Sequence, residues 1–221
     1  MKCLICGCDT VKYDLEVEFI YVCKSCGYGR PTLQDSIIYT DEYEMKYLEY
    51  HEDAINKIRI SFLNSVLNYY GASENSSILD YGCGSGSFVR TLRNTGWHAF
   101  GYDINDFTSD LRPCKDYKPK IITAWDSFEH LNDNQQKEFF DLAKTAKVIC
   151  ISLPDFSSAD KENIYSWRHY RPREHLNYYT FKSLCIRFAH EGFKVAYSSH
   201  EEDLVRSAPW ENNILSVGFI K

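Results

Sequence analysis

Residues 78–88, ILDYGCGSGSF, decide the fold of this chain. An apolar strand pattern contains the acid Asp80, three alternating glycines follow, and a helical pattern begins at Ser87. Glycine adopts the backbone conformations of a tight turn and lets a ligand approach the main chain closely. We therefore expect a strand, a ligand-binding loop and a helix in this order, as in an α/β protein.

A second acid, Asp103, lies 23 residues after Asp80, at the end of the next expected strand. A carboxylate at that place can hold both hydroxyls of a ribose. Ser87 stands where nicotinamide-binding loops have their third glycine, and an acid beside the glycines repels a pyrophosphate but suits a cationic, amino-acid-like group. The expected elements form a βαβ unit: Ser77–Tyr81, Ser87–Asn94 and Trp97–Asp103.

Strands and helices continue to alternate along the rest of the chain. We expect strands at Ile121–Trp125, Val148–Leu153, Phe193–Ser198 and Ile214–Ile220, the last two as an antiparallel pair at one edge of the sheet. Helices are expected at Gln135–Lys144, with Asp133 as its cap, and after the cap residue Thr180. Residues 41–70 are also helical in pattern, beginning with the capping-box pair Asp41 and Glu44.

The stretch ILDYGCGSGSF followed by GYDIN resembles the first two motifs of class I S-adenosylmethionine-dependent methyltransferases. The resemblance implies a Rossmann-like α/β sheet and S-adenosylmethionine as cofactor. The chain also resembles the family at residues 123–131, TAWDSFEHL, which match the fourth-strand motif. The cofactor-binding residues that the resemblance implies are Asp80, Gly82, Cys83, Gly84, Asp103, Ile104 and Asp126.

One segment departs from the family pattern. Only 17 residues separate Asp103 from Ile121, where class I enzymes usually place a helix and a third strand. We expect this edge of the sheet to be shortened. The adenine contact is left unassigned, with Asp110 as the candidate, and a catalytically silent fold is one outcome that the short segment would explain.

Four cysteines near the start of the chain form two Cys-x-x-Cys pairs, Cys3 with Cys6 and Cys23 with Cys26. This spacing predicts a tetrahedral zinc site of four thiolates. Such a site has no open coordination position, so the metal would be structural. Cys8 could replace one ligand, and reduced, metal-free cysteines are the alternative.

Two histidines are the candidate catalytic bases. His130 follows the fourth-strand motif, and His175 lies in residues 167–180, WRHYRPREHLNYYT, a stretch that could cover the cofactor. Each could instead be a structural histidine bonded to Glu129 or Glu174. The arginines and aromatics of this stretch suit a nucleotide sugar or an RNA nucleotide, and a loop packed on the sheet is the alternative.

The same stretch, with its helix, resembles a subgroup of bacterial and phage methyltransferases linked to sugar modification, which often carries an N-terminal zinc ribbon. We therefore predict a zinc ribbon at residues 1–32, a helical linker or cap at 33–72 and a methyltransferase domain at 73–221.

The chain has 25 Lys and Arg against 31 Asp and Glu, a net charge of -6. This balance disfavours nucleic acid as a partner. No signal-peptide pattern or apolar run of membrane-spanning length is present, so we expect a cytoplasmic protein. The leading hypothesis is a methyltransferase acting on a sugar, nucleotide sugar or other small molecule. The alternatives are a macromolecular acceptor, RNA, DNA or protein, and a silent fold that serves as a binding module.

Overall fold

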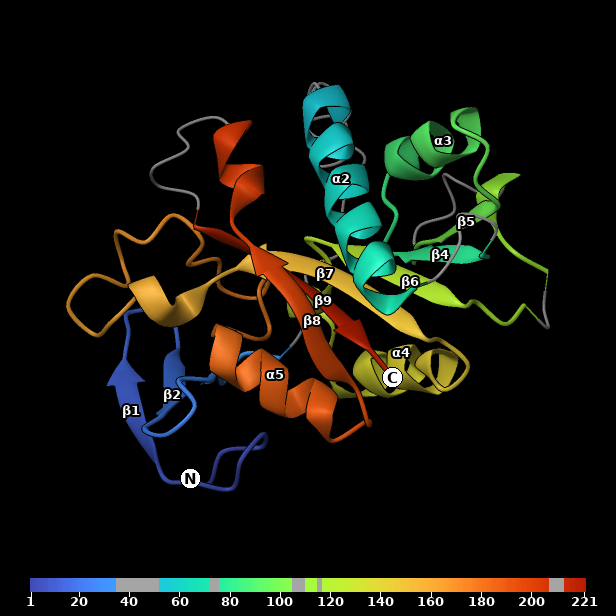
Figure 1. Ribbon diagram of the computed structural model, residues 1–221. Coiled ribbons are helices and arrows are strands. Elements are labelled where there is room, and N and C mark those ends of the chain that lie inside the picture. Colours follow the sequence, from blue (N-terminus) through green and yellow to red (C-terminus); the bar gives the residue numbers. More distant parts are fainter. Residues whose placement is uncertain (35–51, 72–75, 105–109, 115–116, 207–212) are drawn as a thin grey trace.

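A computed structural model of the protein describes residues 1–34, 52–71, 76–104, 110–114, 117–206 and 213–221. Its centre is a six-stranded sheet with the order β5-β4-β6-β7-β9-β8 (Figure 1). The strands are β4 (Ile78–Tyr81), β5 (Ala99–Tyr102), β6 (Ile121–Trp125), β7 (Val148–Pro154), β8 (Lys194–Ser199) and β9 (Ile214–Ile220). The first four are parallel, while β9 runs antiparallel to both β7 and β8. The predicted α/β fold and the antiparallel edge pair are confirmed.

Helices cover both faces of the sheet (Figure 1). On one face lie α2 (Glu52–Tyr70) and α3 (Ser87–Asn94), and on the other lie α4 (Asp133–Ala143) and α5 (Phe181–Ala189). Every residue of β4, β6 and β7 is buried because both faces of these strands are covered. No helix of the described ranges is long and apolar enough to cross a membrane.

The N-terminal ribbon, residues 1–32, has its own antiparallel sheet of β1 (Thr10–Asp14), β2 (Phe19–Cys23) and β3 (Gly29–Pro31). It lies beside α5 in Figure 1. β3 also pairs with the main domain, because Gly29 and Tyr178 exchange both backbone hydrogen bonds, at 2.8 and 2.9 Å. The ribbon is therefore joined to the segment that precedes α5.

Several predicted boundaries need correction. Asn132 caps α4, because its side chain accepts hydrogen bonds from the N–H groups of Asn134 and Gln135; Asp133 is the first helical residue. Residues 41–51 of the predicted long helix, including its capping pair, lie outside the described residues. β5 forms the edge of the sheet in the described residues. Residues 105–109 and 115–116, within the segment predicted to be short, lie outside them.

Candidate functional site

The glycine loop follows β4 at the carboxyl end of the parallel strands. Gly82, Gly84 and Gly86 have φ angles of 76°, 50° and 78°, the left-handed region that favours glycine. A Cβ atom on Gly82 would lie 2.5 Å from Cβ of Ser127, so the loops after β4 and β6 touch at this point. A Cβ atom on Gly84 would meet no described atom within 4 Å. The loop thus has a fixed side against β6 and an open side.

Asp103 joins the loop after β5 to the glycine loop. Its Oδ2 atom accepts a hydrogen bond of 2.8 Å from the N–H of Gly84. Ile104 beside it is 67% exposed. The structure therefore brings Asp103 and Gly84 together, as a shared cofactor site requires. The adenine candidate Asp110 is exposed and forms an ion pair of 3.4 Å with Arg90 of α3.

Two other predicted residues turn their side chains into the protein. Asp80 is 3% exposed and accepts a hydrogen bond of 2.6 Å from the hydroxyl of Thr123 in β6. Cys83 is buried, and its Sγ atom would lie 2.7 Å from a Cβ atom on Gly101. Asp80 therefore ties β4 to β6, and Cys83 fits against β5.

Asp126 follows β6 with a left-handed backbone, φ 50°. Its Oδ2 atom accepts a hydrogen bond of 2.6 Å from Arg59 of α2 and is also bonded to Arg206. Both arginines also pair with Glu202, which is 1% exposed. Burial raises the pKa of Asp126, but Arg206 and Arg59 outweigh it and hold the pKa at about 2. The predicted cofactor residue, whose side chain is 32% exposed, is thus the outer member of an ion-pair cluster that the sequence alone did not indicate.

The two candidate bases lie together. The ring centroids of His130 and His175 are 4.8 Å apart, and both residues come from the carboxyl-end side of the sheet. Nδ1 of His130 is 2.9 Å from the backbone oxygen of Glu174. Burial lowers the pKa of His130 and lowers that of His175 further, with added repulsion from His130. Burial therefore favours the neutral form of both rings, the form in which histidine accepts a proton.

Glu129 completes this group. Its Oε1 atom lies 3.7 Å from Nε2 of His130, and burial together with Asp126 raises its pKa well above the ordinary value. Ligand atoms of Glu129, His130 and His175 all lie within 4.8 Å of one another. A carboxylate and two imidazoles are ligands that divalent transition metals accept. The group could therefore serve proton transfer or hold a cation.

Four cysteines of the ribbon form a second group, at the opposite end from its β1–β2 turn. The Sγ atoms of Cys3 and Cys26 are 3.7 Å apart, those of Cys6 and Cys23 3.4 Å, and those of Cys6 and Cys26 3.6 Å. Thiolates at the corners of a tetrahedral zinc site lie about 3.8 Å apart, whereas a disulfide requires about 2 Å. The residues therefore fit zinc.

Hydrogen bonds and burial act differently on the cysteines of this cluster. Backbone N–H groups of Ser25 and Cys26 point at Sγ of Cys23, each at 3.4 Å. Although burial raises the pKa of Cys23, these bonds and those of the Cys6 and Cys26 side chains lower it to about 7. Burial raises the pKa of Cys26. Cys8 is exposed and lies outside the cluster. The four predicted ligands are thus brought together, and Cys8 is not among them.

The predicted aromatic and arginine stretch is partly a packing element. Tyr178 is 2% exposed and packs with Phe156 and residues of the ribbon, and Trp167 is packed against the same cluster. Arg171 forms an ion pair of 2.9 Å with Glu174. The structure therefore supports the packing alternative for Trp167 and Tyr178.

Glu18 lies in this region with no hydrogen-bond partner for either carboxylate oxygen, although it is only 4% exposed. Burial raises its pKa to about 7.

The raised pKa of Glu18 makes the free energy of unfolding depend on pH. Because the folded pKa exceeds that of the unfolded chain, the contribution of Glu18 to stability is fully present below about pH 4.5 and is lost as the pH rises through about 7. We expect Glu18→Gln to raise the free energy of unfolding at pH 8, by at most about 3 kcal/mol, and to change it little at pH 4.5. Urea denaturation at both pH values checks this, with exposed Glu16→Gln as the control; equal gains at both would contradict it.

Comparisons with known proteins concern the family and the fold of the chain. A model of the methyltransferase domain family matches residues 50–198, more than half of the chain. No curated protein matches it.

Solved structures show the same fold. Magnesium protoporphyrin IX methyltransferase from Synechocystis PCC 6803, with bound SAH, is 13% identical over 85% of this chain and 90% of that one, with a TM-score of 0.53. An S-adenosylmethionine-dependent methyltransferase from Archaeoglobus fulgidus is 15% identical over 83% and 100% of the two chains, with a TM-score of 0.53. Small RNA methyltransferase HEN1 is 17% identical over 75% of this chain and 25% of that one, with a TM-score of 0.50. With its family match, its Rossmann-like sheet and its glycine loop, the chain belongs to the methyltransferase domain family and is an S-adenosylmethionine-dependent methyltransferase.

Proposed function

We propose that the protein transfers the methyl group of S-adenosylmethionine to a hydroxyl group of a sugar, a nucleotide sugar or another small polar molecule. The observation that carries the proposal is the placement of two histidines in ring contact, His130 three residues after Ser127, which touches the glycine loop. The structures of magnesium protoporphyrin IX methyltransferase contain SAH and SAM, and their fold is similar to that of this chain.

The glycine loop and Asp103 are the proposed cofactor site. The backbone of residues 82–84 would face the methionine end on its open side, and the carboxylate of Asp103 would hold the ribose. Asp80 and Cys83 would shape this loop through their contacts with β6 and β5. Ile104 offers exposed apolar surface next to Asp103. Asp126 would act only by placing β6 and α2, because its carboxylate is held by arginines.

His130 is the proposed general base. Its Nδ1 atom faces a backbone oxygen that can only accept, so in the neutral ring Nδ1 carries the proton and Nε2 is the basic nitrogen. The bound cofactor supplies a methyl group on a sulfonium sulfur. The acceptor oxygen would bond to the methyl carbon as the carbon–sulfur bond breaks, and the hydroxyl proton would pass to Nε2. His175, with its ring against His130, would fix the orientation of that ring.

A small acceptor is favoured over RNA or DNA by the net charge of -6. The four cysteines are proposed to hold a structural zinc ion, on the evidence of their spacing and burial. A second candidate role is binding of a divalent cation that in turn binds the acceptor oxygen. The clustering of the ligand atoms of Glu129, His130 and His175 favours this role.

Binding of S-adenosylhomocysteine tests the cofactor site. Gly84→Ala places a methyl group where the described residues leave open space, so it obstructs the ligand; its positive φ adds backbone strain, which the control variant also carries. We expect its dissociation constant, measured by calorimetry, to rise at least about thirtyfold, which corresponds to about 2 kcal/mol. Gly96→Ala is the matched control, because Gly96 also has a positive φ and open space but lies after α3. Equal affinity of both variants would refute the site. With binding established, methyl transfer to nucleotide sugars is the next assay.

A further inference from the structure

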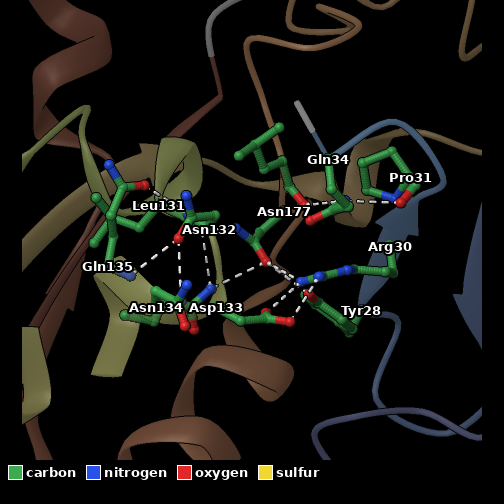
Figure 2. A network of polar contacts seen from close by, with 12 residues as sticks. Tyr28, Arg30, Pro31, Gln34, Leu131, Asn132, Asp133, Asn134, Gln135 and Asn177 are labelled. Carbon is green, nitrogen blue, oxygen red and sulfur yellow. Dashed lines mark hydrogen bonds and ion pairs between the residues drawn. The ribbon is translucent and has the colours of Figure 1, made fainter. Parts of the chain in front are cut away.

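Asn177 connects three parts of the protein that are far apart in the sequence. It is 1% exposed, and it lies two residues after His175. Its side chain makes hydrogen bonds to the ribbon, to α4 and to the loop that contains His130 (Figure 2). We propose that Asn177 is a positioning residue through which the ribbon sets the place of His130 and His175. This inference rests on the proposed function of the histidine pair.

The oxygen of Asn177 accepts three hydrogen bonds, two from the ribbon and one from α4. The hydroxyl of Tyr28 donates at 2.7 Å, Nη1 of Arg30 at 3.3 Å, and the amide of Gln136 at 3.1 Å. Arg30 also makes a two-pronged ion pair with Asp133 at the start of α4, at 2.9 and 3.1 Å (Figure 2). Tyr28 follows Cys26 by two residues, so the hydrogen bond to the Asn177 oxygen depends on the position of the cysteine cluster.

On the histidine side, the amide nitrogen of Asn177 donates two hydrogen bonds. They go to the backbone oxygens of Glu129 at 3.2 Å and Leu131 at 2.7 Å, the residues on either side of His130. The Glu129 oxygen also accepts from the backbone N–H groups of Leu176 and Asn177, each at 3.0 Å. The backbone around His130 is thus clamped to the segment that carries His175.

The chemistry of the side chain explains why asparagine is required here. A primary amide offers two donors and one acceptor oxygen, and both donors and the oxygen are used. Aspartate has no donor for the two carbonyl oxygens, and leucine of similar size has neither group. The groups that bond to the Asn177 side chain come from the ribbon on one side and from the loop around His130 on the other. A shift of the ribbon is therefore transmitted through this side chain to the loop.

The zinc-loaded protein tests the proposal through hydrogen exchange. Tyr28→Phe removes only the hydroxyl that links the ribbon to Asn177, and Asn177→Asp removes the two donors. We expect the amides of Leu176 and Asn177 to exchange at least tenfold faster in both variants, as judged by mass spectrometry. Affinity for S-adenosylhomocysteine should stay within twofold of the wild type. Tyr21→Phe, on β2 of the same ribbon, is the matched control.

The outcomes separate the possible roles. Unchanged exchange at Leu176 and Asn177 in both folded variants would overturn the proposal. Faster exchange throughout the sheet, with loss of S-adenosylhomocysteine binding, would also overturn it, because Asn177 would then only stabilise the fold. With an active acceptor, the expected change is a kcat at least tenfold lower with a cofactor KM within twofold. If the wild type binds no S-adenosylhomocysteine, the proposed function fails, and exchange without the ligand still decides the positioning role.

Discussion

Removal of zinc from the ribbon should destabilise the protein more than any single substitution of a side chain outside it. The four cysteines fit a closed tetrahedral site, and such sites contribute apparent binding free energies of about 10–16 kcal/mol near pH 7. This is comparable to the whole unfolding free energy of an ordinary domain, about 5–15 kcal/mol. Cys3, Cys23 and Cys26 also belong to the main buried cluster of the α4 and α5 face, so loss of the metal should loosen that face.

Thermal unfolding measured by circular dichroism checks this expectation. We expect both a strong chelator and Cys26→Ser to lower Tm by at least about 15 °C, since 1 kcal/mol corresponds to several degrees in a chain of this size. Cys8→Ser is the matched control, because Cys8 is exposed and outside the cluster. An unchanged Tm after chelation, with the metal shown to be absent, would rule out a structural zinc ion.

Loss of the Glu202 carboxylate should cause the next largest decrease in the free energy of unfolding. This buried carboxylate accepts from Arg59 at 3.3 Å and also pairs with Arg206, and both arginines are more than four-fifths buried. Glu202→Gln leaves two guanidinium groups to share the single carboxylate of Asp126. Removing one partner from a buried ion pair typically costs about 3–5 kcal/mol, because an uncompensated charge stays buried.

Urea denaturation at pH 7 gives the measurement for Glu202. Glu201→Gln is the control, because Glu201 lies in the same short 3-10 helix, Glu201–Leu204, but makes no ion pair among the described residues. We expect the midpoint to fall clearly for Glu202→Gln and to stay within error for Glu201→Gln. If the two variants unfold at the same urea concentration, the ion-pair cluster contributes little to stability.

The elements that the sequence predicts well are those with a local signal. The glycine loop, α3 and β6 have the predicted bounds. The signals that define each of them, apolar periodicity and glycines, lie within a few residues of one another in the sequence. The antiparallel pair β8 and β9 is also local in pattern. The predicted cap of α4 is wrong by one residue because Asn132 and Asp133 are both good capping residues, and only the hydrogen bonds distinguish them.

Long-range contacts explain what the sequence could not predict. The family motif marked Asp126 as a cofactor residue, but Arg206 reaches it from 80 positions further along the chain. Packing of Trp167 and Tyr178 against the ribbon likewise depends on a contact between distant segments. The cysteine spacing indicated a metal site but gave no sign of the docking of β3 on Tyr178. Cofactor binding by the glycine loop and proton transfer by the histidines stay predictions.

The docking of the ribbon has a consequence for synthesis of the chain. The ribbon leaves the ribosome before the segments that it docks on, because Tyr28 precedes its partner Asn177 by 149 residues and Cys26 precedes its partner Thr180 by 154 residues. At translation rates of about 5–20 residues per second, this interval lasts about 8–30 s. Its cysteines can capture a metal during that time, whereas the apolar face with Ile20 and Tyr28 stays uncovered. The nascent ribbon therefore exposes this apolar face to solvent until the segment around Asn177 has been synthesised.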